Sequence, residues 1–234
     1  MRSPALEAAL ATVDTVFNGF ASPHETGCGR CHLPEETAYL RTPFTRVPPD
    51  VLEMYVFEVS DHFDDHAAAM RRLLPQGARA MADGTLEGVG WREHGLGVVD
   101  WRSWPAEQAA AIEAFFHAWW EDVLATPEPP NAVEDVFETC AAVLGSFTPL
   151  LDRWKTAPVA DAHLLRCVDQ WLDDLLAESS PFAWCSRATD SDIRELQSWL
   201  AQEAPARLES RDYGLATRAG ALALPYPERW DRLY

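Results

Sequence analysis

Apolar side chains recur at intervals of three and four residues along most of this chain. The first such stripe runs from Leu6 to Phe20, and the longest clear one lies between residues 105 and 125. A period of about 3.6 residues is typical of amphipathic helices, and no segment alternates apolar and polar positions as a half-buried strand would. Further stripes predict helices over the ranges 34–41, 50–70, 75–81, 133–144, 148–154, 158–176 and 190–200. The pattern therefore predicts an all-α fold.

Proline stands at or near the start of several predicted helices, for example at positions 4, 34, 149 and 158. Proline is favoured there because the first helical residue has no intrahelical partner for an amide hydrogen. Short proline-capped links join antiparallel helices. We therefore expect an irregular stack of antiparallel helix pairs, either a degenerate α-solenoid of the HEAT type or a helical bundle. Residues 1–234 should form a single domain, with a soft boundary at the glycine-rich stretch 84–97.

The densest candidate chemistry lies between residues 23 and 32, which read PHETGCGRCH. Cys28 and Cys31 lie two residues apart with a glycine between them, so both thiolates can point at one ion. Zinc would then need two more nitrogen or sulfur ligands in tetrahedral geometry. His24 and His32 are candidates within the stretch. No second C-x-x-C motif follows, so the spacing favours a zinc site without completing it.

Two other interpretations of this stretch remain open. Residues 28–32 read C-x-x-C-H, the attachment pattern of c-type haem, which is a minor alternative. That chemistry normally follows a signal peptide, and Glu7 and Asp14 interrupt any apolar region in residues 1–20. Alternatively, Cys28 and Cys31 are reduced thiols in a surface loop, or a redox pair near the helix that begins at Pro34. Thioredoxin-like chemistry expects a βαβ setting, which the pattern does not predict.

A polar stripe lies beside the apolar face of the helix predicted over 50–70. Its members follow the spacing i, i+3, i+4, i+7 and i+8: Glu58, Asp61, His62, Asp65 and His66. His62 and His66 lie one helical turn apart, so they could share a zinc, iron or manganese ion. The ordinary interpretation is a solvated acidic helix edge. In an intermediate interpretation, His62 or His66 completes a zinc site with Cys28 and Cys31.

The charge balance narrows the class of partner. Asp and Glu number 37 against 19 Lys and Arg, a formal net charge of −18. Because phosphate binding depends on Lys and Arg, nucleic acid and anionic membrane surfaces are disfavoured, and a protein partner with a basic patch is favoured. The five cysteines form no regular framework, which favours a reducing cytoplasm. No apolar run approaches the length of a membrane span.

Several scattered features together carry a resemblance. They are the segment from Gly27-Cys28 to Glu36 with its short helix, Leu74-Pro75, Trp104-Pro105-x-Glu107 with Trp119 downstream, Leu150 to Trp154, and Phe182-x-Trp184. This set resembles an uncharacterised family of bacterial, all-helical proteins with a cysteine-rich segment near the N-terminus. The likeness covers roughly residues 25 to 200 and rests on tryptophans and prolines, residue types that indicate how a chain packs. The resemblance implies an all-helical fold and indicates no activity. The family's segment more often reads C-x-C-C, a departure that weakens the haem interpretation.

These observations favour two functions from different classes. The first is a non-enzymatic cytosolic helical binding or scaffold module, with Cys28 and Cys31 holding a metal such as zinc or remaining as thiols. The alternative is a metal-dependent enzyme built on the polar stripe defined above. No catalytic triad order, Walker loop, H-E-x-x-H motif or dinucleotide fingerprint is present to favour the enzyme.

Overall fold

The computed structural model describes residues 2–86, 95–182 and 189–233, and every regular element within those ranges is helical. The helices are α1 (Pro4–Val16), α2 (Pro34–Arg41), α3 (Pro49–Val56), α4 (His66–Asp83), α5 (Ala106–Ala125), α6 (Val133–Leu144), α7 (Thr148–Leu151), α8 (Pro158–Leu176), α9 (Asp190–Leu208), α10 (Tyr213–Gly220) and α11 (Tyr226–Leu233). Short 3-10 turns lie between them: η1 (Ser60–His62), η2 (Leu96–Val98), η3 (Trp101–Ser103) and η4 (Ala221–Ala223). The predicted all-α fold is confirmed.

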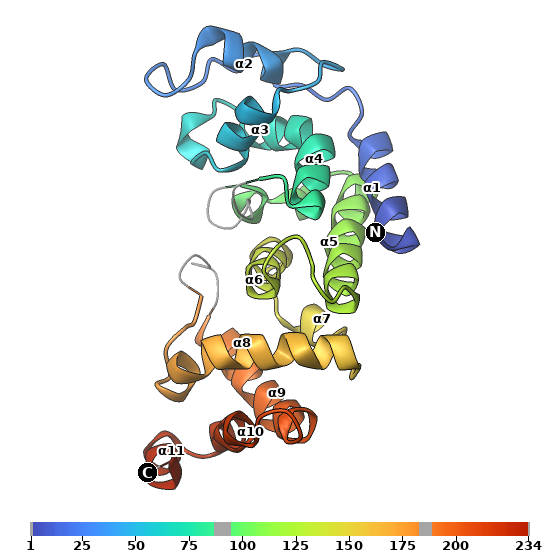
Figure 1. Cartoon of the computed structure of the whole chain (residues 1–234). Helices are drawn as coiled ribbons and strands as arrows, with labels where there is room; N and C mark the ends of the chain where they lie inside the picture. The colour runs from blue at the N-terminus through green and yellow to red at the C-terminus, as the bar shows by residue number, and fades with distance from the viewer. Residues whose placement is uncertain (1, 87–94, 183–188, 234) are drawn as a thin grey trace.

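The helices follow one another in chain order along the molecule, from α2 at one end to α11 at the other (Figure 1). Sequence neighbours pack together in several places: α3 against α4, α5 against α6, α8 against α9 and α9 against α10. The first helix departs from that order, because α1 lies along α5 and also contacts α4. Contacts between consecutive helices therefore supply only part of the packing.

One continuous cluster of buried apolar side chains runs through the fold, and its centre is aromatic. The Trp120 ring lies 5.2 Å from Trp154 and 5.5 Å from Phe137, both in edge-on orientation. Both of these indoles have a hydrogen-bond partner, since Trp120 donates to the Leu150 carbonyl and Trp154 to the Ala160 carbonyl. Burying these rings without an unpaired N–H gives the core its stability.

Proline stands at several helix starts as expected, and a polar side chain caps the first of them. The Ser3 side chain accepts a hydrogen bond from the Leu6 amide at 3.2 Å, and Pro4 opens α1. The predicted ranges 34–41 and 158–176 coincide with α2 and α8. α1 ends at Val16 rather than near Phe20. α9 continues to Leu208, well beyond the predicted end at 200.

The prediction of one helix over 50–70 is wrong, because these residues form two helices separated by a turn. α3 ends at Val56, η1 occupies Ser60–His62, and α4 begins at His66. The amides of Asp64 and Asp65, which a continuous helix would direct at carbonyls one turn earlier, donate instead to the buried Glu25 carboxylate. The side chain of Asp65 then caps α4 by accepting a hydrogen bond from the Ala68 amide.

The separate helix predicted over 75–81 is also wrong, since α4 runs through Pro75 without a break and ends at Asp83. A proline inside a helix removes one backbone hydrogen bond and costs about 3 kcal/mol. Here the residues around it are fully buried, among them Leu73, Leu74 and Ala78, so tertiary packing outweighs that cost.

The remaining expectation concerns the soft boundary between residues 84 and 97. Residues 87–94, most of the proposed soft boundary at 84–97, lie outside the described residues. Beyond Gly214 the chain continues as α10 and α11. Within the described part of the chain, no helix is both long enough and apolar enough to cross a bilayer.

Candidate metal centre

Two segments far apart in sequence meet at the cysteine motif: the loop between α1 and α2, and the connection between α3 and α4. The buried carboxylate of Glu25 joins them, because it accepts hydrogen bonds from the amides of Asp64 at 2.9 Å and Asp65 at 3.4 Å. In the other direction, Oδ2 of Asp64 accepts hydrogen bonds from the amide and hydroxyl of Thr26 at 2.7 and 2.6 Å. These two hydrogen bonds lower the pKa of Asp64. Each segment thus supplies a carboxylate that binds the backbone of the other.

Gly27 makes the turn that leads from this contact into the cysteines. Its φ of +69° lies in the left-handed region, which side chains other than glycine's rarely adopt. A Cβ at this position would also lie 2.9 Å from the Thr37 hydroxyl oxygen and 3.1 Å from Nδ1 of His32. The glycine is therefore required both for the backbone conformation and for space.

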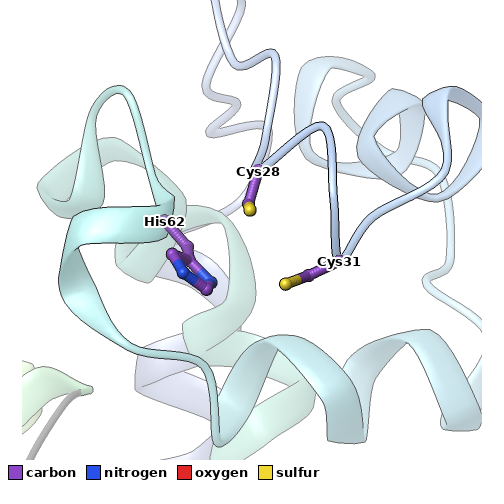
Figure 2. A group of neighbouring side chains, drawn as sticks. All are labelled: Cys28, Cys31 and His62. Atoms are coloured by element: carbon purple, nitrogen blue, oxygen red, sulfur yellow. The ribbon is translucent and has the colours of Figure 1, made fainter.

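The C-x-x-C segment folds into a tight turn held by three hydrogen bonds, two between backbone groups and one to a side chain. The amides of Cys31 and His32 donate to the Cys28 carbonyl at 3.0 and 2.9 Å. The Cys28 amide donates in turn to Nδ1 of His32 at 3.1 Å. This turn directs both sulfur atoms to one side of the loop, with Cys28 half-buried and Cys31 exposed (Figure 2).

His62 of η1 faces the two sulfurs from the opposite segment (Figure 2). One of its ring nitrogens and the sulfurs of Cys28 and Cys31 all lie within 4.8 Å of one another. Zinc–sulfur bonds of about 2.3 Å and zinc–nitrogen bonds of about 2.0 Å would place tetrahedral ligands about 3.5–4 Å apart. The three donor atoms are thus close to coordination distance and need only a small inward movement to hold one ion.

The electrostatics of the turn distinguish the two thiols. The pKa of Cys28 is lowered, chiefly by a hydrogen bond from the Arg30 amide and then by contacts with the side chain and amide of Cys31. The pKa of Cys31 is raised, first of all because its thiol donates to Cys28. Cys28 is therefore the thiol that ionises first, and thiolate is the form that binds metal.

The structure gives His32 a supporting position outside this group. Its ring is buried and packs 4.8 Å from the ring of Tyr55. Because Nδ1 accepts the Cys28 amide, the proton sits on Nε2, which donates to Oε2 of Glu58 at 2.6 Å. Both nitrogens are occupied, so in this conformation His32 can bind neither zinc nor a haem iron.

Glu58 lies between the two histidines: it is hydrogen-bonded to His32 and makes a close contact with His62 that is not aligned as a hydrogen bond. Its Oε2 accepts from His32, while Oε1 lies 2.9 Å from Nδ1 of His62 and accepts the Val59 amide at 2.8 Å. Burial raises the pKa of Glu58, but the hydrogen bonds from Val59 and His32 outweigh it, so the net pKa is lowered. A carboxylate on the second nitrogen of a metal-binding histidine is a common outer-shell arrangement, which fixes ring orientation.

The other predicted site residues lie apart from the group. His24 is exposed on the loop, and His66 opens α4 with its ring stacked 5.1 Å from Phe63. Asp61 is exposed in η1, and Asp65 caps α4. Because the predicted helix is broken, the five-residue polar stripe does not form one helix face. The intermediate hypothesis, in which His62 joins the cysteine pair, is the arrangement that the structure brings together.

Glu25 is the important residue that the sequence did not indicate. Its partners Asp64 and Asp65 lie 39 and 40 residues further along the chain, so no local spacing marks them. The spacing marks Glu58 only as a member of a polar stripe, and its position between two imidazole rings depends on the turn that replaces the helix.

Comparisons with protein-family models, with curated proteins and with solved structures find no match to this chain.

Proposed function

We propose that this protein is a helical binding module that holds one Zn²⁺ through Cys28, Cys31 and His62. The observation that carries the proposal is the convergence of two sulfurs and an imidazole nitrogen, from separate segments, within 4.8 Å. Two thiolates and an imidazole are a typical zinc donor set, whereas magnesium and calcium prefer oxygen ligands. The lowered pKa of Cys28 further supports a thiolate at this position.

The proposed role of the metal is to fasten the α1–α2 loop to the α3–α4 connection. The existing link consists of hydrogen bonds, chiefly those of Glu25 and Asp64. A bond from zinc to both segments would add a covalent-like restraint across a long stretch of chain, and such a restraint stabilises the folded state. Glu58 would keep the His62 ring in the orientation that binding requires.

Three protein ligands leave one tetrahedral position for water or for a group from a partner.

As the binding partner we propose a protein with a basic patch, which the net charge of −18 supports. Binding of an arginine-rich probe peptide to the zinc-loaded chain should weaken as salt rises, because screening shortens the reach of surface charges. Binding that is insensitive to salt would contradict this part of the proposal.

The alternative function, a metal-dependent enzyme, is favoured by one specific observation. Three protein ligands with an open position are the arrangement of catalytic zinc, whereas structural zinc usually has four. Asp61 and Asp65 do not approach the group, so such an enzyme would rely on Glu58 as its nearby carboxylate. Cobalt substitution separates the two functions, because azide shifts the visible spectrum only where the fourth position exchanges.

Metal analysis of the purified chain tests the site itself. We expect one zinc per chain, lost in the Cys28→Ser/Cys31→Ser double variant and in His62→Ala, with a lowered melting temperature in each. His24→Ala is the matched control, since His24 is a histidine of the same loop outside the group. No zinc in the unmodified chain, or zinc retained by His62→Ala and lost by His24→Ala, would refute the assignment.

A further inference from the structure

A second site lies away from the metal group, in a cavity of about 680 Å³. It opens where the C-terminal end of α1 meets the segment before α3, with α3 and α4 as its other walls. Its volume is in the range of small-molecule sites, about 300–1,000 Å³. None of Cys28, Cys31 and His62 lines it, so it is independent of the proposed zinc site.

Much of the cavity wall is apolar. Phe17, Val47 and Leu52 line it, and all three belong to the buried core. Phe20 and Leu86 extend this surface. An apolar lining of this kind binds the hydrocarbon or aromatic part of a ligand.

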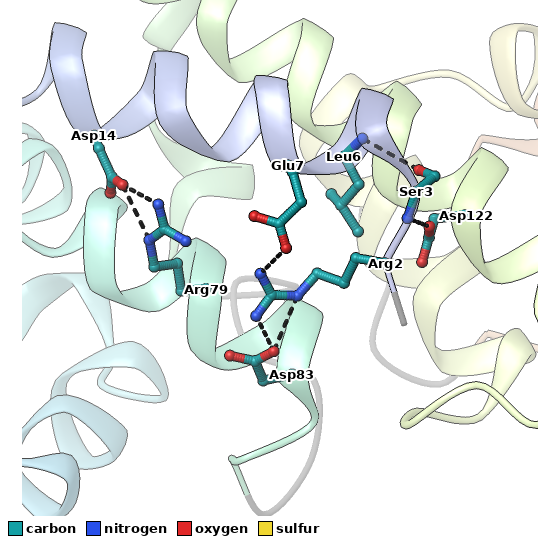
Figure 3. Close-up of polar contacts among 8 residues, drawn as sticks. All are labelled: Arg2, Ser3, Leu6, Glu7, Asp14, Arg79, Asp83 and Asp122. Atoms are coloured by element: carbon teal, nitrogen blue, oxygen red, sulfur yellow. Dashed lines mark hydrogen bonds and ion pairs between the residues drawn. The ribbon is translucent and has the colours of Figure 1, made fainter.

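The charged residues of the wall are unequal in number, with three arginines and two aspartates. Both aspartates already have basic partners (Figure 3). Oδ2 of Asp14 accepts from Nε of Arg79 at 3.0 Å, and Oδ1 of Asp83 accepts from Nε of Arg2 at 3.0 Å. The two carboxylates of the cavity are therefore neutralised.

Arg72 and Arg46 are the remaining cations, and among the described residues neither is paired with a carboxylate. The side chain of Arg72 is only 7% exposed, and its guanidinium donates to the carbonyls of Tyr39 and Thr45. These carbonyls satisfy hydrogen bonds without supplying a negative charge. Burial lowers the pKa of Arg72, and no acidic neighbour offsets this effect.

Phe44 borders the same cavity in an unusual conformation. Its side chain is 78% exposed and its φ is +61°, a strained value for a residue with a Cβ. The ring lies over Gly19, where an added Cβ would meet it at 2.6 Å. A large exposed aromatic ring held beside an apolar cavity indicates a surface for a ligand's apolar part, since strained residues cluster at ligand sites.

We propose that this cavity binds a small organic monocarboxylate with an apolar body, its carboxylate directed at Arg46 and Arg72. An acidic chain that leaves two arginines without acidic partners at one cavity offers the complement to a single anionic group. A polyphosphate fits less well, because the two arginines without acidic partners cannot balance three or more negative charges. The apolar lining accounts for the rest of the ligand.

Decanoate is a suitable probe, titrated into the full chain by calorimetry with 1-decanol as its uncharged analogue. We expect saturable binding of one decanoate per chain and decanol binding at least about ten-fold weaker, as expected for loss of one charge-assisted contact. Arg46→Ala should weaken decanoate binding about ten-fold, because it removes one charge-assisted contact. Arg46 is exposed, so its removal leaves the core intact. Arg194→Ala, an exposed arginine of α9, is the control and should bind as the unmodified chain does.

Arg72 also holds two carbonyls, so its removal risks unfolding, and Arg72→Lys is the second variant. It keeps the charge but loses the planar fork that matches a carboxylate, and we expect weaker binding with the fold retained by circular dichroism. The proposal is overturned if decanoate shows no saturable binding, if decanol binds equally well, or if Arg46→Ala and Arg72→Lys both bind decanoate with unchanged affinity. Loss of zinc binding in the metal-site variants has no bearing on these outcomes, so the two proposals fail separately.

Discussion

Nε2 of His32 lies 2.6 Å from Oε2 of Glu58, while Nδ1 of the same ring accepts the Cys28 amide. One imidazole therefore joins the cysteine turn to the carboxylate that also contacts His62. The histidine nearest the cysteines in sequence thus serves as a support, and the more distant histidine supplies the candidate metal ligand.

The two histidines should consequently respond differently to substitution. His62→Ala should abolish zinc binding, whereas His32→Gln should retain zinc with about 10- to 100-fold lower affinity, the usual effect of losing an outer-shell partner. Competition with a chelator of known affinity measures both. Equal loss in the two variants would instead make His32 a direct ligand after rearrangement of the loop.

Glu25 is expected to be the most important side chain for holding the two segments together. Glu25→Gln places an amide NH₂ group where backbone N–H groups now donate, and should lower the free energy of unfolding by about 2–3 kcal/mol. Urea unfolding at neutral pH measures the change. Glu35→Gln, at an exposed position on α2, should shift it by less than about 0.5 kcal/mol. Equal effects would show that Glu25 contributes no more than a surface carboxylate.

The two glycines of the cysteine loop provide a matched pair. Gly27→Ala should destabilise the chain by about 1–2 kcal/mol, because Gly27 has φ of +69° and no room for a Cβ. Gly29→Ala should be close to neutral, since a Cβ there meets nothing within 4 Å. Thermal unfolding of both variants, with and without added zinc, checks the difference. If Gly27→Ala proves as stable as Gly29→Ala, the turn adopts another conformation in solution.

Local patterns predicted much of the fold because many helices are determined by their own residues. The stripe predicted between residues 105 and 125 corresponds to α5, whose inward face carries Ile112, Phe115 and Trp119. Proline and serine at positions 4 and 3 likewise marked the start of α1. In these segments the apolar period and the capping residues agree with the tertiary packing.

The segment between α3 and α4 shows where such reasoning fails. Its residues follow a helical spacing, yet the amides of Asp64 and Asp65 are taken by Glu25, a partner 39 and 40 residues away. That tertiary interaction outweighs the local preference. The same break explains the site: Cys28 and Cys31 were predictable from their spacing, but the choice of His62 among several histidines depends on the turn at η1.

The buried thiols should react differently from the loop thiols. Burial raises the pKa of Cys140 and Cys167 well above its usual range, so both should resist iodoacetamide in the folded chain and react only after unfolding. Cys28 and Cys31 should react in the metal-free protein and be protected by added zinc. Mass spectrometry of the labelled peptides distinguishes these sites. Fast labelling of Cys140 in the folded state would contradict its buried position.

Stability should fall as the pH drops through the histidine range, with His163 as one source. Its ring is buried in α8, Nε2 donates to the Thr126 carbonyl at 2.8 Å, and Nδ1 accepts from Arg166. Burial is the main cause of its lowered pKa; Arg166 also lowers it, and the Thr126 carbonyl and Glu134 oppose the shift only partly.

Because the folded state resists protonation, the unfolded chain takes up the proton first, near pH 6.5. The contribution of His163 is therefore fully present above that pH and is lost as the pH falls toward the lowered folded value. His163→Gln should lose stability at pH 7.5 and show a shallower decline between pH 7.5 and pH 5 in urea unfolding. A steeper decline in His163→Gln would mean that the ring is protonated in the folded protein.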